Sequence, residues 1–210
     1  MRIPFYGLRN EAEAEAYSYF HHNIRPLPQD SSGKTDIYSG KLWNNDADAF
    51  RHAYVSGVFT QEYGKRIAEV FGSLNEFSAV EKPKDEENMD LWNNNVGRKY
   101  GLRTSSRKEL LDLIRQALQD GELIITPHDS RKYQGSYHKI DPQKPVVTCK
   151  ETKTGGNESF LDLQTFELMS REEFCGKIES GLYPGYTTAH LDALVIAVSK
   201  PDGILENNLG

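Results

Sequence analysis

The stretch WNNDADAFRHAYVSG, residues 43–57, decides how the N-terminal half of the chain folds. Asn44, Asn45 or Asp46 offers an N-cap, and apolar residues then recur at helical spacing. The members of this apolar series are Phe50, Tyr54, Phe59, Tyr63, Ile67 and Val70. The pattern predicts one long central helix from about Asp46 to Phe71.

Further helices are predicted on both sides of this one. Strong helix formers occupy 10–23, and MDLWNNNVGRKYGL, residues 89–102, predicts a helix that ends near its second glycine. Ser106 and Glu109 form a capping-box pattern before LLDLIRQAL, and Gly121 supplies a stop. The N-terminal part of the chain is therefore predicted to be helical.

The pattern changes after residue 121. ELIITP, at 122–127, predicts a short strand, and a polar, proline-punctuated linker follows. VVTCKETK and SFLDLQTFEL then have strand character, REEFCGKIES follows a second capping-box pattern, and LDALVIAVSKPDG predicts a last strand. The fold class predicted is a mainly α N-terminal helical domain, residues 1–128, with a small α+β C-terminal module, residues 142–210.

Composition narrows the class of protein. The 210 residues carry a formal net charge of -6, which argues against a protein that grips nucleic acid with a basic face. No apolar run reaches the roughly 18 residues of a transmembrane helix, and the N-terminus lacks the apolar core of a signal peptide. We therefore expect synthesis in the cytoplasm, with any export through a specialised secretion system. Cys149 and Cys175 do not form a metal-type pair, and two reduced thiols are favoured over one disulfide.

Asp48 and His52 are four residues apart and share a face of the predicted central helix. A carboxylate one turn before an imidazole can fix its tautomer and raise its basicity, as a general base requires. Arg51 is three residues from Asp48, so that the same carboxylate can instead form an ion pair with the guanidinium. Spacing leaves both the catalytic and the structural interpretation open.

Three consecutive asparagines, residues 93–95, are unfavourable inside a helix, because their amides compete with the backbone. In one interpretation at least one of them is useful to the fold or the function, either as a buried polar group that bonds to backbone or as a ligand contact. In the other interpretation they form a solvated turn. Asp90 and Arg98 flank them, and could pair with Arg51 and Asp48 across two packed helices. Such a network would explain both stretches without catalysis.

Glu76 is a further carboxylate, at the end of the predicted long helix before a break, where active-site acids often lie. A surface glutamate is the alternative interpretation. The HExxH, GxSxG, P-loop and GxGxxG motifs are absent, which excludes the commonest metalloprotease, hydrolase and nucleotide-binding signatures. Any cofactor or metal therefore remains unknown at this point.

The two polar stretches together resemble a bacterial domain of unknown function found in polymorphic toxins and secreted effectors. Its pattern runs N-x-x-D-A-x-R-H-A-x-W, then H-E, then M-D-x-x-N-N-x-x-G-R. The matching residues are Asn45, Asp48, Ala49, Arg51, His52, Ala53, Glu76, Met89, Asp90, Asn93, Asn94, Gly97 and Arg98. The likeness covers about residues 40–126. A second likeness, to a small bacterial module that often ends in Asn-Asn-Leu, covers about residues 145–210.

Two positions depart from the pattern. Val55 stands in place of the first motif's aromatic residue, and Asn75 stands where a histidine would precede Glu76. If that histidine holds a metal in relatives, its replacement puts a metal site here in doubt.

The resemblance favours a bacterial effector or toxin enzyme, a hydrolase of an envelope component such as peptidoglycan or phospholipid. His52 would be the base or a ligand and Asp48 would orient it, while the arginines would hold an anionic group. The residues expected at the site are Asp48, His52 and Glu76 for catalysis, and Arg51, Asp90, Asn94 and Arg98 for substrate binding. A cognate immunity or secretion-adaptor protein is the partner expected of such a domain.

The alternative hypothesis is a non-catalytic helical binding protein, in which the same polar residues form a buried network that fixes helix register. Exposure distinguishes the two hypotheses. A catalytic His52 should line a cleft shared with Asn94 and Glu76, whereas a structural one should be sealed.

Overall fold

The computed structural model describes residues 5–37, 39–77, 83–135, 141–151, 156–165, 167–191, 194–203 and 208–209, and within them the side chains of 5, 6, 73–77, 150 and 151 are excepted. The chain divides into two compact units, Met1–Tyr137 and His138–Gly210. A helical N-terminal region is followed by antiparallel strands, which confirms the predicted fold class.

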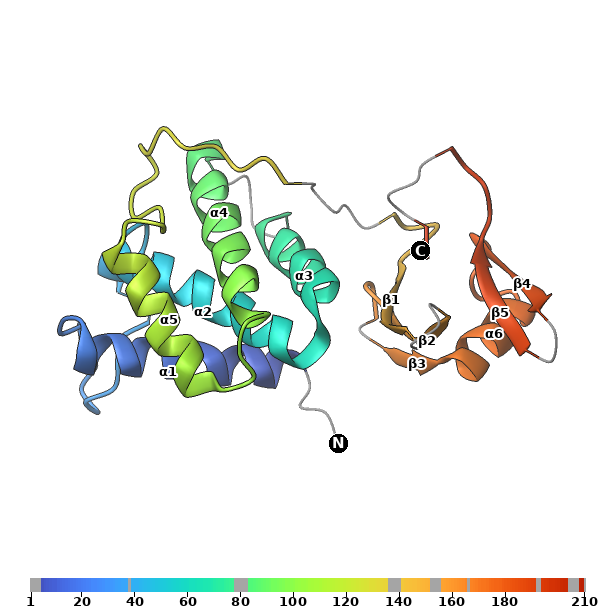
Figure 1. Ribbon diagram of the computed structural model, residues 1–210, viewed down its shortest axis with the longest axis horizontal. Coiled ribbons are helices and arrows are strands. Elements are labelled where there is room, and N and C mark those ends of the chain that lie inside the picture. The colour runs from blue at the N-terminus through green and yellow to red at the C-terminus, as the bar shows by residue number, and fades with distance from the viewer. Residues whose placement is uncertain are drawn as a thin grey trace. The chain divides into compact units, whose positions relative to one another are not determined.

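The first unit is built from helices (Figure 1). They are α1 (Phe5–Asn23), the short 3-10 helix η1 (Gly40–Leu42), α2 (Asp46–Tyr63), α3 (Lys65–Phe77), α4 (Lys84–Gly101) and α5 (Arg107–Gln119). Helix α2 is central, because it contacts α1, α3, α4 and α5. Figure 1 shows α4 between α3 and α5.

Helix α2 begins where the N-cap was predicted. The side chain of Asn45 accepts hydrogen bonds from the backbone N–H groups of Ala47 and Asp48, at 2.9 and 3.2 Å. These two N–H groups have no partner inside a helix, so the cap satisfies them and fixes the first turn. The turn that carries Asp48 is thereby held in place.

Helices α2 and α4 pack in direct backbone contact, as their polar stretches predicted. A Cβ atom at Gly97 would lie 1.9 Å from the carbonyl oxygen of Ala53, and one at Gly101 would lie 2.4 Å from that of Gly57. Both separations are too short for any side chain, so the glycines of α4 permit the close approach. The approach brings the polar face of each helix against the other.

The predicted long helix from Asp46 to Phe71 was wrong, because the chain breaks it at Gly64. This residue has φ of +87°, a conformation that glycine adopts far more readily than other residues, and it caps α2 before α3 begins at Lys65. Helix α4 begins earlier than the predicted residue 89, since residues 84–88 already belong to it. Helix α1 likewise begins earlier than the predicted residue 10.

The strand predicted at 122–127 was wrong as well, and Asn93 explains why. Its Nδ2 atom donates to the carbonyl oxygen of Ile124 at 2.8 Å, and the N–H group of Ile124 donates back to Oδ1 at 2.9 Å. The amide side chain thus replaces a neighbouring strand. Asn93, fully buried, confirms the interpretation that one asparagine of the run bonds to backbone.

In the described residues of the second unit, two antiparallel sheets combine with one helix. A three-stranded sheet has the order β1-β2-β3, β4 and β5 form a hairpin, and α6 packs against both. The elements are β1 (Val146–Glu151), β2 (Asn157–Asp162), β3 (Leu168–Ser170), α6 (Arg171–Glu179), β4 (Tyr186–Leu191) and β5 (Leu194–Ser199). The capping box of Ser170 and Glu173 at α6 is confirmed.

The described residues of this unit share a hydrophobic core. Its buried members are Val146, Phe160, Met169, Phe174, Cys175, Ile178, Tyr186, Ala197 and Leu209. The Tyr186 hydroxyl accepts from the N–H of Val146 at 2.9 Å and donates to its carbonyl oxygen at 3.1 Å, joining β4 to β1. Cys149 and Cys175 are not joined by a disulfide. Among the described residues, no helix is long and apolar enough to cross a bilayer.

Candidate functional site

Asp48 and His52 of α2 meet Asp90 of α4 to form an acid–histidine cluster. The Nε2 atom of His52 lies 3.2 Å from Oδ1 of Asp90 and 3.7 Å from Oδ1 of Asp48. One nitrogen and two carboxylate oxygens lie within 4.8 Å of one another. The exposed fractions of the Asp48, His52 and Asp90 side chains are 7, 11 and 2%. The cluster is therefore almost enclosed, with its widest exposure at the imidazole.

The backbone before α2 orients the Asp48 carboxylate. The N–H group of Asn44 donates to Oδ2 of Asp48 at 2.9 Å, and Asn44 holds a φ of +55°, which is uncommon for a residue other than glycine. This bond leaves Oδ1 turned toward His52 and Arg51. The loop conformation is thus tied to the position of one carboxylate oxygen.

Arg51 supplies the positive charge beside the cluster. Its Nη2 atom lies 2.7 Å from Oδ1 of Asp48 and 2.6 Å from Nε2 of His52, while Nη1 donates to Oε1 of Glu13 on α1 at 3.1 Å. The predicted ion pair between Asp48 and Arg51 is therefore present. The Arg51 side chain is 17% exposed, the largest exposed fraction among these groups except for Glu13.

The electrostatics favour an ionised Asp48. Burial by itself would raise the pKa of this carboxyl, but the charges of His52 and Arg51 and a hydrogen bond from Arg51 bring it below its ordinary value. Burial would likewise lower the pKa of Arg51, and the carboxylates of Asp48 and Glu13 with Tyr17 raise it instead. The pair is held as a carboxylate and a guanidinium.

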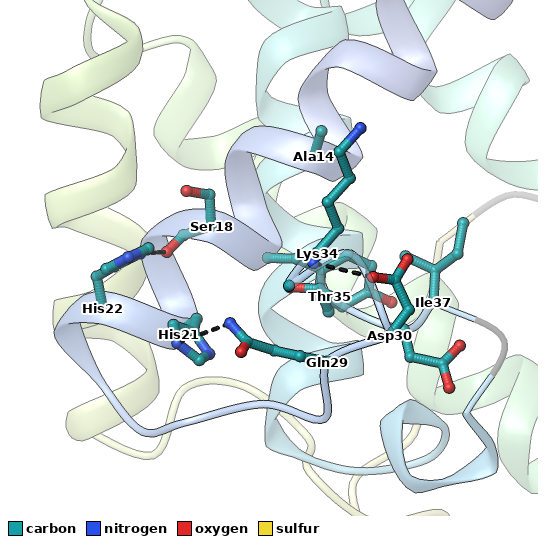
Figure 2. Close-up of a pocket in the computed structure, with 12 residues that line it drawn as sticks. Ala14, Ser18, His21, His22, Gln29, Asp30, Lys34, Thr35 and Ile37 are labelled. Carbon is teal, nitrogen blue, oxygen red and sulfur yellow. Dashed lines mark hydrogen bonds between the residues drawn. The ribbon is translucent and has the colours of Figure 1, made fainter.

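A pocket of about 520 Å³ lies between α1 and the segment 29–37 (Figure 2). Its lining includes Tyr17, His21, Gln29 and Lys34, and Figure 2 shows the Lys34 side chain extending toward α1. His21 accepts a hydrogen bond from the N–H of Leu27 at 3.0 Å, which holds the chain just before this segment against the end of α1. The pocket is thus framed by structured backbone.

Tyr17 connects the pocket to the cluster. Burial raises its pKa to about 12, the nearby carboxylates of Asp48 and Glu13 also raise it, and Arg51 opposes them. Tyr17 thus lies within electrostatic reach of the cluster and also lines the pocket. One side chain of α1 therefore contributes to both.

Asn94 and Arg98 lie one and two turns beyond Asp90 on the same face of α4. Their side chains approach α3, because a Cβ atom at Gly72 would lie 3.2 Å from Nδ2 of Asn94 and 3.4 Å from Nη1 of Arg98. Asn94 is 5% exposed and Arg98 is 1% exposed. The structure therefore places both of these predicted substrate-binding residues inside the first unit.

Arg98 makes its contacts away from Asp48. Its Nη2 atom lies 3.3 Å from the Tyr133 hydroxyl, 3.4 Å from Oδ1 of Asn95 and 3.9 Å from Oε1 of Glu69. Burial lowers its pKa from the ordinary value. Within the described residues, the predicted pairing of Arg98 with Asp48 is not found, whereas Asp90 does meet the α2 cluster through His52.

Glu76 belongs to α3, but its side chain lies outside the described residues, as does that of Asn75. The prediction for Glu76 therefore stays a prediction. The exposure of His52 falls between the two outcomes expected for a cleft and for a sealed network.

Glu13 and Tyr17 were not predicted as site residues. They are four apart on the predicted helix at 10–23 and so share a face, which is the one signal that points to them. Sequence spacing does not say which neighbouring helix such a face meets. Their contact with Arg51 depends on how α1 packs on α2.

Comparison with known protein families gives a match over part of the chain. Residues 29–122 match the model of a family described as Domain of unknown function (DUF6973). The matched stretch contains the acid–histidine cluster and Arg51. The predicted likeness to a domain of unknown function is confirmed at that level. No curated protein and no solved structure matched the chain.

Proposed function

We propose that this protein is a hydrolase of the bacterial effector or toxin type, with the acid–histidine cluster as its reactive centre. The observation that carries the proposal is the convergence of one imidazole nitrogen and two carboxylate oxygens from α2 and α4. Buried charged groups are costly, and such clusters are concentrated at functional sites. The substrate proposed is an envelope component, either peptidoglycan or phospholipid.

The chemistry supported by this arrangement is activation of water. A neutral imidazole beside carboxylates can take a proton from water and is then stabilised as a cation by them. Alternatively, the same three atoms can hold a cation that acidifies a water molecule. In the first route His52 holds the proton taken from water, whereas in the second His52 would be a ligand of the cation, which would lower the pKa of the water.

Arg51 is the group proposed to meet an anionic substrate. Its side chain is 17% exposed, and a guanidinium can form paired hydrogen bonds with a phosphate or carboxylate. Phospholipid carries a phosphodiester and the peptides of peptidoglycan carry carboxylates, so both proposed substrates offer such a group. The pocket lined by Tyr17 is the proposed approach to it.

Expression in a bacterial host tests the proposal. The wild-type chain would be produced in the cytoplasm and, with an added signal sequence, in the periplasm, beside His52→Ala and the control His190→Ala in the second unit. Growth arrest in one compartment, lost in His52→Ala and retained in His190→Ala, is expected. Purified protein is then assayed for product release from peptidoglycan and from phospholipid vesicles. Absence of arrest in both compartments together with absence of product would contradict the proposal.

A second candidate is favoured by the burial of the cluster. The side chains of Asp48 and Asp90 are 7 and 2% exposed, and Arg51 already forms an ion pair with Asp48, as in a polar network that fixes the register of packed helices. In that case the first unit is a binding domain. His52→Ala would then lower stability with no catalytic activity to lose.

A further inference from the structure

We infer that the acid–histidine cluster is a binding site for one first-row divalent cation such as zinc. The guanidinium of Arg51 lies beside this site and leaves Asp48 and His52 when the cation binds. The inference rests on the proposed function in one respect, because it assigns the activation of water to a bound cation rather than to the imidazole alone. The binding of the cation is nevertheless measured without any substrate.

The spacing of the three atoms suits a metal ion. Zinc bonds to nitrogen and oxygen of about 2.1 Å in tetrahedral geometry place neighbouring ligand atoms about 3.4 Å apart. The distances from Nε2 of His52 are 3.2 Å to Asp90 and 3.7 Å to Asp48. The two separations from Nε2 therefore already match those of zinc ligands, and the three ligand atoms all lie within 4.8 Å of one another. An imidazole with two carboxylates is also a donor set that suits first-row divalent cations.

The hydrogen-bonding neighbours of His52 Nε2 also favour a bound cation. This atom faces a guanidinium donor of Arg51 at 2.6 Å and a carboxylate oxygen of Asp90 at 3.2 Å. Whether the ring is neutral or protonated, this nitrogen either carries a hydrogen or offers a lone pair, so it cannot serve both neighbours well. A cation between the three atoms accepts a lone pair from each of them, which removes the conflict.

Outer contacts orient the ligands as metal sites require. The Asn44 N–H group holds Oδ2 of Asp48 and leaves Oδ1 for the cluster. Such partners one shell beyond the ligands fix ligand orientation in known metal sites. The Asn45 cap holds the same turn of α2.

Arg51 has a second ion-pair partner that it can keep when a cation enters the cluster. Its Nη1 atom already bonds Glu13 of α1 at 3.1 Å, so the side chain can keep this partner while Nη2 leaves Asp48 and His52. The guanidinium occupies the space beside two of the three ligand atoms. It therefore competes with the cation, and its removal should tighten cation binding.

Zinc titration of the full-length protein tests the inference, with bound metal measured by equilibrium dialysis and elemental analysis. Wild type should bind one zinc per chain, and zinc should raise its thermal midpoint because it binds the folded state. His52→Gln and Asp90→Asn should each weaken zinc binding by at least about tenfold. A loss of this size is typical even when a residue that only hydrogen-bonds to a metal ligand is replaced. Arg51→Gln should tighten it. His22→Gln is the matched control. The rings of His21 and His22 are neighbours outside the cluster, so this change removes a histidine from a pair of histidines without altering the cluster.

Several results would overturn the inference. These are absence of zinc binding, binding that persists in both His52→Gln and Asp90→Asn, and binding that occurs only after Arg51 is removed. If a ligand variant does not fold, nitrogen NMR of wild-type histidines decides, since zinc must shift Nε2 of His52. Zinc binding without hydrolysis of either substrate overturns the proposed function alone. Hydrolysis by a chain that binds no zinc overturns this inference alone.

Discussion

His52 lies between a guanidinium and two carboxylates, so removal of its ring has different consequences for a reactive centre and for a structural network. In a reactive centre, His52→Ala should abolish activity and leave stability nearly unchanged. In a network, the change leaves buried groups unsatisfied and should cost about 1 to 3 kcal/mol for each. Thermal melts beside the growth assay distinguish the outcomes. Wild-type toxicity in a stably folded variant would rule out catalysis by His52.

Asn94→Ala is the companion variant. If Asn94 shares a site with His52, the two changes should have the same pattern of lost activity and retained stability. The structure places Asn94 beside Gly72 of α3, one turn away from Asp90, so a stability loss without an activity loss is the contrasting outcome. The same melts and growth assay, run on both variants, decide between them.

Asp129 provides a pH test at the residue scale. Hydrogen bonds from Arg131 lower the pKa of Asp129 from 3.8 to about 2, and Arg131 also donates to the carbonyl oxygens of Gly121 and Leu123. A lowered pKa means that the pair stabilises the fold above about pH 4 and loses this effect as the pH falls through about 2.

The unfolding free energy of Asp129→Asn should therefore fall below that of wild type at pH 6, and the difference should shrink at pH 3. Urea titrations at both values measure it. Glu172→Gln, a change at an exposed position of α6, is the control. A difference that grows on acidification would contradict the assigned sign.

At the scale of elements, Gly97 tests the contact between α2 and α4. An added Cβ would lie 1.9 Å from a backbone oxygen, which cannot move without shifting a helix. Gly97→Ala should therefore destabilise the first unit by about 1 to 3 kcal/mol or more, as overpacking does. Gly176→Ala in α6 is the matched control, since nothing lies within 4 Å of its added atom.

The control should instead be neutral or stabilise the second unit by up to about 1 kcal/mol, because alanine favours a helix over glycine. Differential scanning calorimetry of both variants measures the two effects. Equal effects of the two substitutions would mean that α2 and α4 are not in backbone contact.

Elements with local signals could be predicted from the sequence. The Asn45 cap, the Gly121 stop and the Ser170 capping box each act within a few residues, and all three are found. The break at Gly64 was missed because one glycine is tolerated inside many helices, and only its positive φ separates α2 from α3. Strand β4 was missed because YTTAHL lacks strong apolar alternation.

The candidate site could likewise be predicted only where the signal lies within a few residues of sequence. The spacing of Asp48 and His52 placed them on one face, and the flanking position of Asp90 suggested a partner on another helix. Asp90 meets His52, however, and Arg98 meets Tyr133, Asn95 and Glu69, since side-chain pairing across helices depends on packing that spacing does not encode. The contribution of α1 was likewise outside what local patterns determine.

At the scale of the whole molecule, the two compact units predict independent folding. A fragment of residues 1–141 keeps all of the first unit, and the second unit has its own buried core. We expect this fragment to unfold cooperatively, with a midpoint close to that of the first unit in the full chain. Circular dichroism during heating measures it. A fragment without a cooperative transition would show that the second unit completes the first.

The Tyr186 hydroxyl, which bonds both backbone groups of Val146, makes the exchange of one amide hydrogen a reporter for the second unit. The first N–H of β1 is protected by a side chain from β4 rather than by another strand. Its deuterium uptake therefore follows the separation of the hairpin from the three-stranded sheet, even when both sheets stay intact. In Tyr186→Phe this amide should exchange much faster than those within the β1 ladder. Mass spectrometry or NMR of exchanged protein would show whether the two sheets open as one cooperative unit or separately.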